Sequence, residues 1–250
     1  MLVLALETSS KFGSVALIRD GNVLEFQEYD EANAHAERLL PLVESVLRAA
    51  NCSRHELSRV AVGTGPGNFT GLRVGLSLAY GMGIGLAIPV VGVGSLKAIA
   101  SAAQDGAIET IMVLRDARKE EFFAAVFDGS LNPLLEPHLV KRLSAQEWVR
   151  TVLDLHVKSG TPWTVLGDGL GALDQDELVS AGARLLENAA WMRPDARHIG
   201  LLGEGCEVSE WPLPEYIREV DAVLPSLRKN PALDSELGAP SERVSEVKNG

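Results

Sequence analysis

The chain has 250 residues, 46% of them hydrophobic, which suffices for the core of one two-lobed unit or of two small domains. Acidic residues outnumber basic residues by 34 to 23, and the net charge of −11 argues against a protein that binds nucleic acid through a broad basic surface of its own. The two cysteines, Cys52 and Cys206, fit no metal-ligand spacing, so we expect reduced thiols and a cytoplasmic protein rather than a disulfide framework.

The first apolar run, residues 1–7, is too short for a secretory signal and lacks its basic flank, so it predicts a β-strand. A turn and a second strand, Ser14–Ile18, follow it. The same order of strand, acid, turn and strand returns at Thr110–Asp116 and Glu121–Phe127, and a hairpin signal follows each copy. This internal repeat predicts two related lobes.

An acidic residue ends the first strand of each copy, Glu7 in one and Asp116 in the other. Two-lobed phosphotransferases place such acids to face metal and phosphate across a cleft. Neither acid is followed here by the glycines that would let backbone N–H groups close over a phosphate. The sequence therefore predicts paired carboxylates without a phosphate cradle around them.

A helix is expected from Asn33, as its cap, to Ala50. Pro41 predicts that this helix either starts later than residue 34 or is kinked. His35 has no second metal ligand at a convincing spacing, so it is interpreted as a surface or capping side chain. The apolar stripe is wider than one helix face needs, and it comprises Leu39, Leu40, Leu42, Val43, Val46, Leu47 and Ala50.

A glycine-rich stretch, Gly63–Gly75, joins the short strand Val60–Val62 to a second helix. Its glycines allow positive φ and close backbone approach, and the free N–H groups at the start of the helix favour an anion. Two interpretations stay open. One is a phosphate cradle that lacks the lysine of a P-loop, and the other is a tight strand-to-helix turn without a ligand.

Residues 74–93 carry no charge and have the length of a membrane-spanning helix. Their glycines and Pro89 argue instead for two soluble elements, a helix that ends near Leu86 and a buried strand, Val90–Val93. Internal packing and contact with a protein partner both fit one face of this helix. Small residues recur on that face every four positions, at Gly71, Gly75, Ala79 and Gly83.

Several motifs follow in the order seen in the TsaB family. They are residues 4–9, His35 with residues 38–41, the stretch 63–75 with its Phe-Thr-Gly-Leu-Arg sequence, residues 92–93 with 95–96, and residues 116–118. The chain resembles this family most over residues 1–130, and residues 214–218 resemble a short family ending. The family provides the dimerisation subunit of the bacterial machinery that makes threonylcarbamoyladenosine in tRNA.

The resemblance implies an α/β fold of the actin-like ATPase (ASKHA) superfold, with two ribonuclease-H-like lobes whose mixed sheets are flanked by helices. We place the lobes at residues 1–105 and 106–223 and expect a mobile tail at residues 224–250, where Pro, Ser, Glu and Lys are frequent.

Members of the family use two N-terminal helices to pair with TsaD, the catalytic subunit, or with themselves when TsaD is absent. The resemblance therefore implies a non-catalytic scaffold that binds a TsaD-like subunit, with a TsaE-like ATPase as a further partner and tRNA reached only through the complex. The residues expected at the interface are His35, Leu39, Leu42, Val43, Val46, Leu47, Gly71, Gly75, Ala79 and Gly83.

TsaD carries a His-x-x-x-His metal pair just after the strand that corresponds to Val90–Val93, and here those positions are Ser95 and Ile99. Neither side chain can replace imidazole as a ligand, so no metal site is expected. No cofactor is expected to bind tightly. ATP or ADP with magnesium at the partner interface is a hypothesis whose candidate contacts are Glu7, Thr8, Ser9, Gly65, Gly67, Thr70 and Arg118.

An alternative from another functional class is an ATP-dependent small-molecule kinase of the same superfold. It would use Glu7 and Asp116 around magnesium and the turn at residues 65–71 around phosphate. The kinase predicts magnesium-dependent nucleotide turnover by the isolated chain, whereas the scaffold predicts none.

Overall fold

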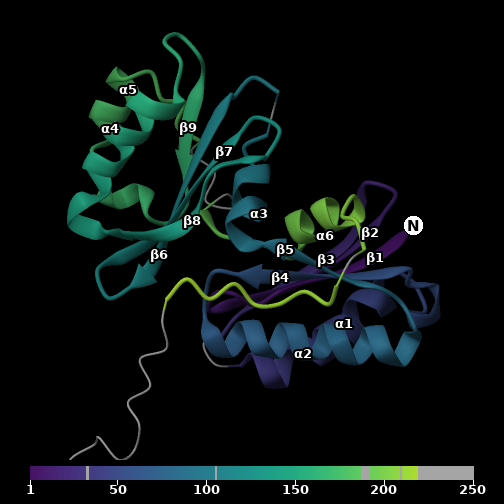
Figure 1. Cartoon of the computed structure of the whole chain (residues 1–250). Coiled ribbons are helices and arrows are strands. Elements are labelled where there is room, and N and C mark those ends of the chain that lie inside the picture. The colour runs from purple at the N-terminus through teal and green to yellow at the C-terminus, as the bar shows by residue number, and fades with distance from the viewer. Residues whose placement is uncertain (32–33, 105, 187–191, 209, 219–250) are drawn as a thin grey trace, which may run out of the picture. The chain divides into compact units, whose positions relative to one another are not determined.

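Two mixed β-sheets organise the chain in the computed structural model (Figure 1), which describes residues 1–31, 34–104, 106–186, 192–208 and 210–218. The first sheet has the strand order β3-β2-β1-β4-β5, with β1 at Leu2–Glu7, β2 at Phe12–Arg19, β3 at Asn22–Asp30, β4 at Arg59–Gly65 and β5 at Val90–Gly94. The second has the order β8-β7-β6-β9, with β6 at Thr110–Arg118, β7 at Glu121–Asp128, β8 at Pro133–Lys141 and β9 at Trp163–Leu166.

The two sheets repeat one topology. Strand β1 pairs antiparallel with β2 and parallel with β4, and β6 pairs antiparallel with β7 and parallel with β9. In each sheet a third strand extends the hairpin. The internal repeat predicted from the sequence is confirmed as a repeat of strand order.

Helices supply the long connections that parallel strands require. They are α1 at His35–Ala49, α2 at Phe69–Leu86, α3 at Ser95–Ser101, α4 at Ala145–His156, α5 at Gln175–Ser180 and α6 at Ala196–Glu204, with 3-10 turns η1 at Arg54–Glu56, η2 at Arg142–Ser144 and η3 at Leu170–Ala172. Among the described residues, no helix is both long and apolar enough to cross a membrane.

Strand β1 shows why the first sheet is covered on both faces. All six of its residues are buried. Leu4 and Leu6 belong to the core shared with α1 and α2, whereas Val3 and Ala5 belong to the core shared with α6. Figure 1 shows α1 and α2 on one side of this sheet and α6 on the other. Apolar residues at every position of a strand are typical of a sheet that helices cover on both sides.

The second sheet is built in the same way. Met112 and Leu114 of β6 share a core with α4 and α5, and Ile111 and Val113 share a core with α3. Helix α3 also contributes Ala98 to the core of the first sheet, so this short helix packs on both lobes.

The first helix starts after residue 34, one of the two predicted alternatives, but its cap differs from the expected one. It begins at His35 and runs unbroken through Pro41 to Ala49, so the proline costs it a backbone hydrogen bond without ending it. Its cap position is Ala34, which makes no side-chain cap. Asn33, the expected cap, lies outside the described residues.

The predicted second lobe, residues 106–223, includes helix α6 at Ala196–Glu204. Helix α6 returns to the first sheet, where Ala196 and Ile199 are fully buried against β1, β2 and β4. Residues 1–217 form one unit, and the predicted tail at 224–250 lies outside the described residues.

Candidate functional site

The glycine-rich loop leads from β4 into α2. Strand β4 ends at Gly65, whose φ of 103° suits glycine alone. Asn68 then caps α2, because its side chain accepts a hydrogen bond from the Gly71 N–H (2.9 Å), and the Asn68 N–H donates to the carbonyl oxygen of Ser9 (2.8 Å). Two of the N–H groups that an anion would use are therefore bonded inside the chain.

Glycines let this loop lie directly against the residues that follow β1. A Cβ atom at Gly67 would stand 2.2 Å from the carbonyl oxygen of Ser9, and one at Gly71 would stand 2.1 Å from the carbonyl oxygen of Thr8. No side chain fits at either position. The loop is thus a tight strand-to-helix turn whose glycines serve close packing.

The Glu7 carboxylate is enclosed at the end of β1, with 1% of the residue exposed. One oxygen accepts a hydrogen bond from the Ser9 N–H, and the other accepts one from the Ser95 hydroxyl (3.1 Å). Gly63 covers a further side, because a Cβ atom there would stand 2.1 Å from the carboxylate. Donors of the chain itself therefore hold this acid.

Arg115 of β6 joins the two lobes from inside. Its buried guanidinium donates to the Ser9 hydroxyl (2.9 Å), the Ser9 carbonyl (2.7 Å) and the Pro66 carbonyl (2.8 Å). The planar fork of an arginine suits such a bridge between two loops. Sequence reasoning missed this residue, although the alternation of β6 points it to the same side as Ile111 and Val113.

Negative charges around Arg115 partly offset the cost of burying its guanidinium. Burial lowers the pKa of Arg115, and the carboxylates of Glu7, Asp168 and Asp116 oppose that shift. Loss of water around Asp168 raises the pKa of its carboxyl, while the hydrogen bond from the Asp116 N–H (2.6 Å) works in the other direction. A lone buried cation would be costly, so these acids are part of what keeps Arg115 in place.

The structure does not bring the predicted carboxylate pair together as a metal site. Glu7 is enclosed, whereas Asp116 is exposed and accepts hydrogen bonds from the Arg118 N–H (2.9 Å) and from Arg142 (3.5 Å). The acid bonded to Asp116 is Asp168, whose carboxylate accepts a hydrogen bond from the Asp116 N–H. Among the described residues, no three His, Cys, Asp or Glu side chains converge in a way that could hold a metal ion.

The candidate nucleotide contacts do not form a cradle. Glu7, Thr8, Ser9 and Gly65 are buried, and Gly67 is half-buried against Ser9. Thr70 and Arg118 are exposed. The residues after β1 pack directly against the glycine loop, and the Arg115 side chain bonds to both segments.

His35, expected at the surface or at a partner interface, is an internal residue with 4% exposure. Its Nδ1 lies 2.7 Å from the Tyr29 hydroxyl and its Nε2 lies 2.9 Å from the Ser10 carbonyl oxygen. Both ring nitrogens therefore bond within the first lobe, so the interface assignment of His35 is corrected.

The other residues expected at the partner interface also lie in the core of the chain. Leu39, Val43, Val46 and Leu47 pack on the first sheet, where each is at most 9% exposed, and Leu42 is half-buried beside them. The small-residue face of α2 turns inward as well, with Gly71, Gly75, Ala79 and Gly83 all buried. The amphipathic patterns were recognised correctly, but the sheet of the same chain covers them.

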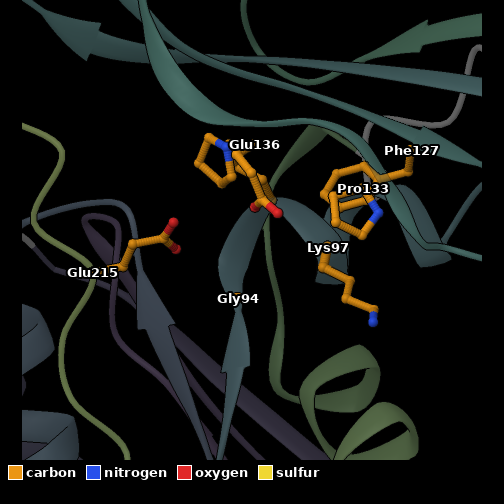
Figure 2. Close-up of a pocket in the computed structure, with 8 residues that line it drawn as sticks. Gly94, Lys97, Phe127, Pro133, Glu136 and Glu215 are labelled. Carbon is orange, nitrogen blue, oxygen red and sulfur yellow. The ribbon is translucent and has the colours of Figure 1, made fainter.

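A cavity of about 200 Å³ lies where residues of β5, α3, β7 and β8 meet the segment after α6 (Figure 2). Figure 2 shows the Glu215 carboxylate pointing toward Glu136. Burial, and to a lesser degree the charge of Glu136, raises the pKa of Glu215 to about 7. Sequence reasoning missed this acid, because no periodic pattern surrounds it. The lining residues are Gly94, Leu96, Lys97, Phe127, Pro133, Glu136, Pro137 and Glu215.

Comparison with known proteins identifies the family. The family model for TsaD, described as tRNA N6-adenosine threonylcarbamoyltransferase, matches residues 29–141. A protein of Escherichia coli (strain K12) named tRNA threonylcarbamoyladenosine biosynthesis protein TsaB is 30% identical over 220 residues, which cover 80% of this chain and 91% of that protein. The chain belongs to the TsaB family. The TsaB protein of Bacillus subtilis (strain 168) is 29% identical over 231 residues, covering 89% of this chain and 96% of its own.

Solved structures agree with this assignment. A crystal structure from Pseudomonas aeruginosa, of an uncharacterized protein with similarity to peptidase YeaZ, has a TM-score of 0.68 and 26% identity and covers 87% of this chain and 99% of that chain. Component A of the (R)-2-hydroxyglutaryl-CoA dehydratase of Acidaminococcus fermentans has a TM-score of 0.53 at 8% identity, covering 81% of this chain and 97% of its own, and shows likeness of fold alone. The predicted fold class, two mixed α/β sheets of the actin-like ATPase superfold, is confirmed.

In this TsaB family member, Ser95 and Ile99, which the sequence analysis compared with a metal pair, belong to the core. Ser95 is fully buried and donates to Glu7, and Ile99 is 1% exposed among the apolar side chains under the second sheet. A hydroxyl already bonded to a carboxylate and an isoleucine leave no imidazole for a transition metal.

Proposed function

We propose that this chain is a non-catalytic scaffold subunit, required for threonylcarbamoyl transfer to adenosine of tRNA, that acts by binding a TsaD-like catalytic subunit. The proposal rests on membership of the TsaB family together with the filled junction between the lobes. At this junction the Arg115 guanidinium bonds to Ser9 and to Pro66 of the glycine loop, so the two lobes are held together by groups of the chain itself.

Because the inner faces of α1 and α2 are buried, we propose that the outer faces of the same two helices form the partner surface. Helices α1 and α2 lie side by side under the first sheet (Figure 1), and each keeps one face free of it. Leu40 on α1 is 50% exposed and Ile84 on α2 is 72% exposed. We define the α1–α2 outer face by its exposed residues Glu37, Arg38, Leu40, Glu44, Arg48, Thr70, Arg73, Ser77, Gly81 and Ile84.

This face suits a helical bundle with a second pair of helices. Gly81 has open space around the position of a Cβ atom and lies one turn from Ser77, so another helix can approach α2 closely there. In the absence of the TsaD-like subunit, the same face is proposed to pair two copies of this chain.

The further partners follow from the family. A TsaE-like ATPase is proposed to join the complex, and tRNA is proposed to reach this chain only through it. Nucleotide at the partner interface remains a proposal, with Thr70 and Arg118 as its exposed candidate contacts.

Size-exclusion chromatography with light scattering tests the proposal, using the chain alone and mixed with the TsaD-like protein of the same cell. We expect a heterodimer that forms at the expense of a homodimer and that fails with Leu40→Glu. The matched control is Leu143→Glu, because Leu143 is 98% exposed but lies in η2 of the second lobe. No complex in any nucleotide state, together with magnesium-dependent nucleotide turnover by the isolated chain, would instead support the kinase alternative.

A further inference from the structure

The segment after α6 lies along α2 in the opposite direction. We call residues 210–217 the C-terminal strap. Near its start, the Trp211 ring packs edge-on against Tyr80 (5.2 Å between centroids) and lies 3.3 Å from the position of a Cβ atom at Gly83. Near its end, the Tyr216 ring lies 5.0 Å from that of Phe69. The strap therefore follows α2 for about 14 residues, or roughly 20 Å of helix.

Backbone contacts fix the strap in place. The Glu215 N–H donates to the Thr64 carbonyl oxygen (2.8 Å), and the Tyr80 hydroxyl donates to the Pro212 carbonyl oxygen. Pro212 also packs on β5, where a Cβ atom at Gly92 would stand 2.6 Å from its ring. The strap is thus an ordered part of the first lobe.

Its apolar side chains nevertheless remain in solvent. Trp211 is 50% exposed, Leu213 is 77% exposed and Tyr216 is 45% exposed, and Phe69 beside them is 38% exposed. Aromatic residues in a contiguous row are enriched at protein interfaces and often carry much of the binding energy there.

Arg73 stands at the end of this row with its guanidinium held in position. The guanidinium lies over the Phe69 ring at 3.7 Å, and its Nε–H donates to the Tyr216 hydroxyl (3.2 Å). Among the residues that the structure describes, no carboxylate pairs with Arg73, and its two terminal nitrogens make no hydrogen bond. A fork that is already oriented and unpaired is suited to a carboxylate of another molecule.

We propose that the strap and the adjacent edge of α2 form a docking surface for the TsaD-like catalytic subunit, which places a carboxylate on Arg73 and apolar side chains on Phe69, Leu213 and Tyr216. This inference rests on the proposed function and extends its interface. Arg73 belongs both to the α1–α2 outer face and to the strap contact, so the two surfaces are continuous. The net charge of −11 makes a protein carboxylate a better occupant than an RNA phosphate, which would need more cations nearby.

Isothermal titration calorimetry of the full chain with the TsaD-like subunit tests this surface. We expect Arg73→Ala and Leu213→Asp each to raise Kd by roughly tenfold or more. Arg73→Lys keeps the charge but loses the planar guanidinium, so its Kd should lie between those of wild type and Arg73→Ala. Leu155→Asp is the control, because Leu155 is 72% exposed on α4 of the second lobe, and its Kd should match that of wild type.

The outcomes separate this inference from the proposed function. If wild type does not bind the catalytic subunit, the proposed function fails and the docking surface fails with it. If wild type binds, and Arg73→Ala and Leu213→Asp bind as tightly as Leu155→Asp, the docking surface alone is overturned. The docking surface would also be overturned if Arg73→Ala bound the catalytic subunit as wild type does but bound fluorescently labelled tRNA more weakly. That result would favour an RNA contact at Arg73. Thermal unfolding of each variant verifies that it is folded.

Discussion

Replacing Arg115 with alanine removes the bridge that holds the glycine loop and Ser9 to the second lobe. Three hydrogen bonds from a charged donor are lost; the Pro66 carbonyl loses its Arg115 partner, whereas the Ser9 carbonyl keeps the hydrogen bond from the Asn68 N–H. Hydrogen bonds to charged groups contribute about 1.5–3 kcal/mol each, but the cost of burying the guanidinium, which also lowers its pKa, offsets part of that sum. We therefore expect Arg115→Ala to lower the free energy of unfolding by about 3–5 kcal/mol, the range for breaking a buried charged pair.

Urea unfolding measures this loss as a shift in midpoint at a constant slope. Urea is preferred to guanidinium chloride, because guanidinium ion carries the same group as the deleted side chain. Ser9→Ala removes one of the three contacts and should cost about 1–2 kcal/mol. Arg54→Ala, at an exposed position of η1, should stay within about 0.5 kcal/mol of wild type. An Arg115→Ala variant as stable as Arg54→Ala would refute the bridge.

Other expectations concern the helices and the cavity. Val43→Glu should unfold the chain, because it buries a charge in the core at a cost of several kcal/mol, and circular dichroism should show the loss of structure. Leu40→Glu, at a half-exposed position of the same helix, should leave the melting temperature nearly unchanged. Gly71→Ala should destabilise by about 1–3 kcal/mol through its clash with a backbone oxygen, and Gly81→Ala, which meets open space, should stabilise by about 0.5–1 kcal/mol in the same urea assay. The folded-state pKa of Glu215, about 7, lies above its ordinary 4.5, so its contribution to the free energy of unfolding is complete below pH 4.5 and is lost as pH rises through 7. In thermal melts, Glu215→Gln should flatten this dependence of stability on pH by an amount on the order of 1 kcal/mol after solvent screening. An unchanged pH dependence in the variant would count against the buried carboxyl.

Strand and helix types followed from the sequence because periodicity reports directly on burial. The apolar runs at residues 2–7 and 110–116, each ending in an acid, predicted strands, and the duplicated pattern predicted duplicated sheets. Pro89, which lies between the two elements, correctly predicted that α2 ends before β5 begins.

Periodicity did not predict what covers each face. It showed that Leu39, Val43 and Val46 share one side of a helix, but a partner helix and a sheet of the same chain satisfy that pattern equally well. The resemblance predicts that these two helices bind a partner, and the three-dimensional structure distinguishes their inner faces from their outer ones.

Charged residues in apolar surroundings were the hardest to assign. The acceptors of Arg115 lie more than 45 residues away in the sequence, so no local sequence pattern predicts the bridge. Glu215 owes its raised pKa to burial against the first lobe and to Glu136 of β8, which the sequence does not place near each other. Such contacts depend on how the two sheets are joined.

The most direct test of the scaffold is reconstituted threonylcarbamoyl transfer to tRNA, with modified adenosine measured by mass spectrometry. The reaction contains tRNA, a threonylcarbamoyl donor, ATP, the TsaD-like subunit and the TsaE-like ATPase, with or without this chain. The account predicts no product without the chain, full product at equimolar chain, and loss of product with Leu40→Glu but not with Leu143→Glu. Equal product with and without the chain, or with Leu40→Glu at the wild-type level, would contradict it.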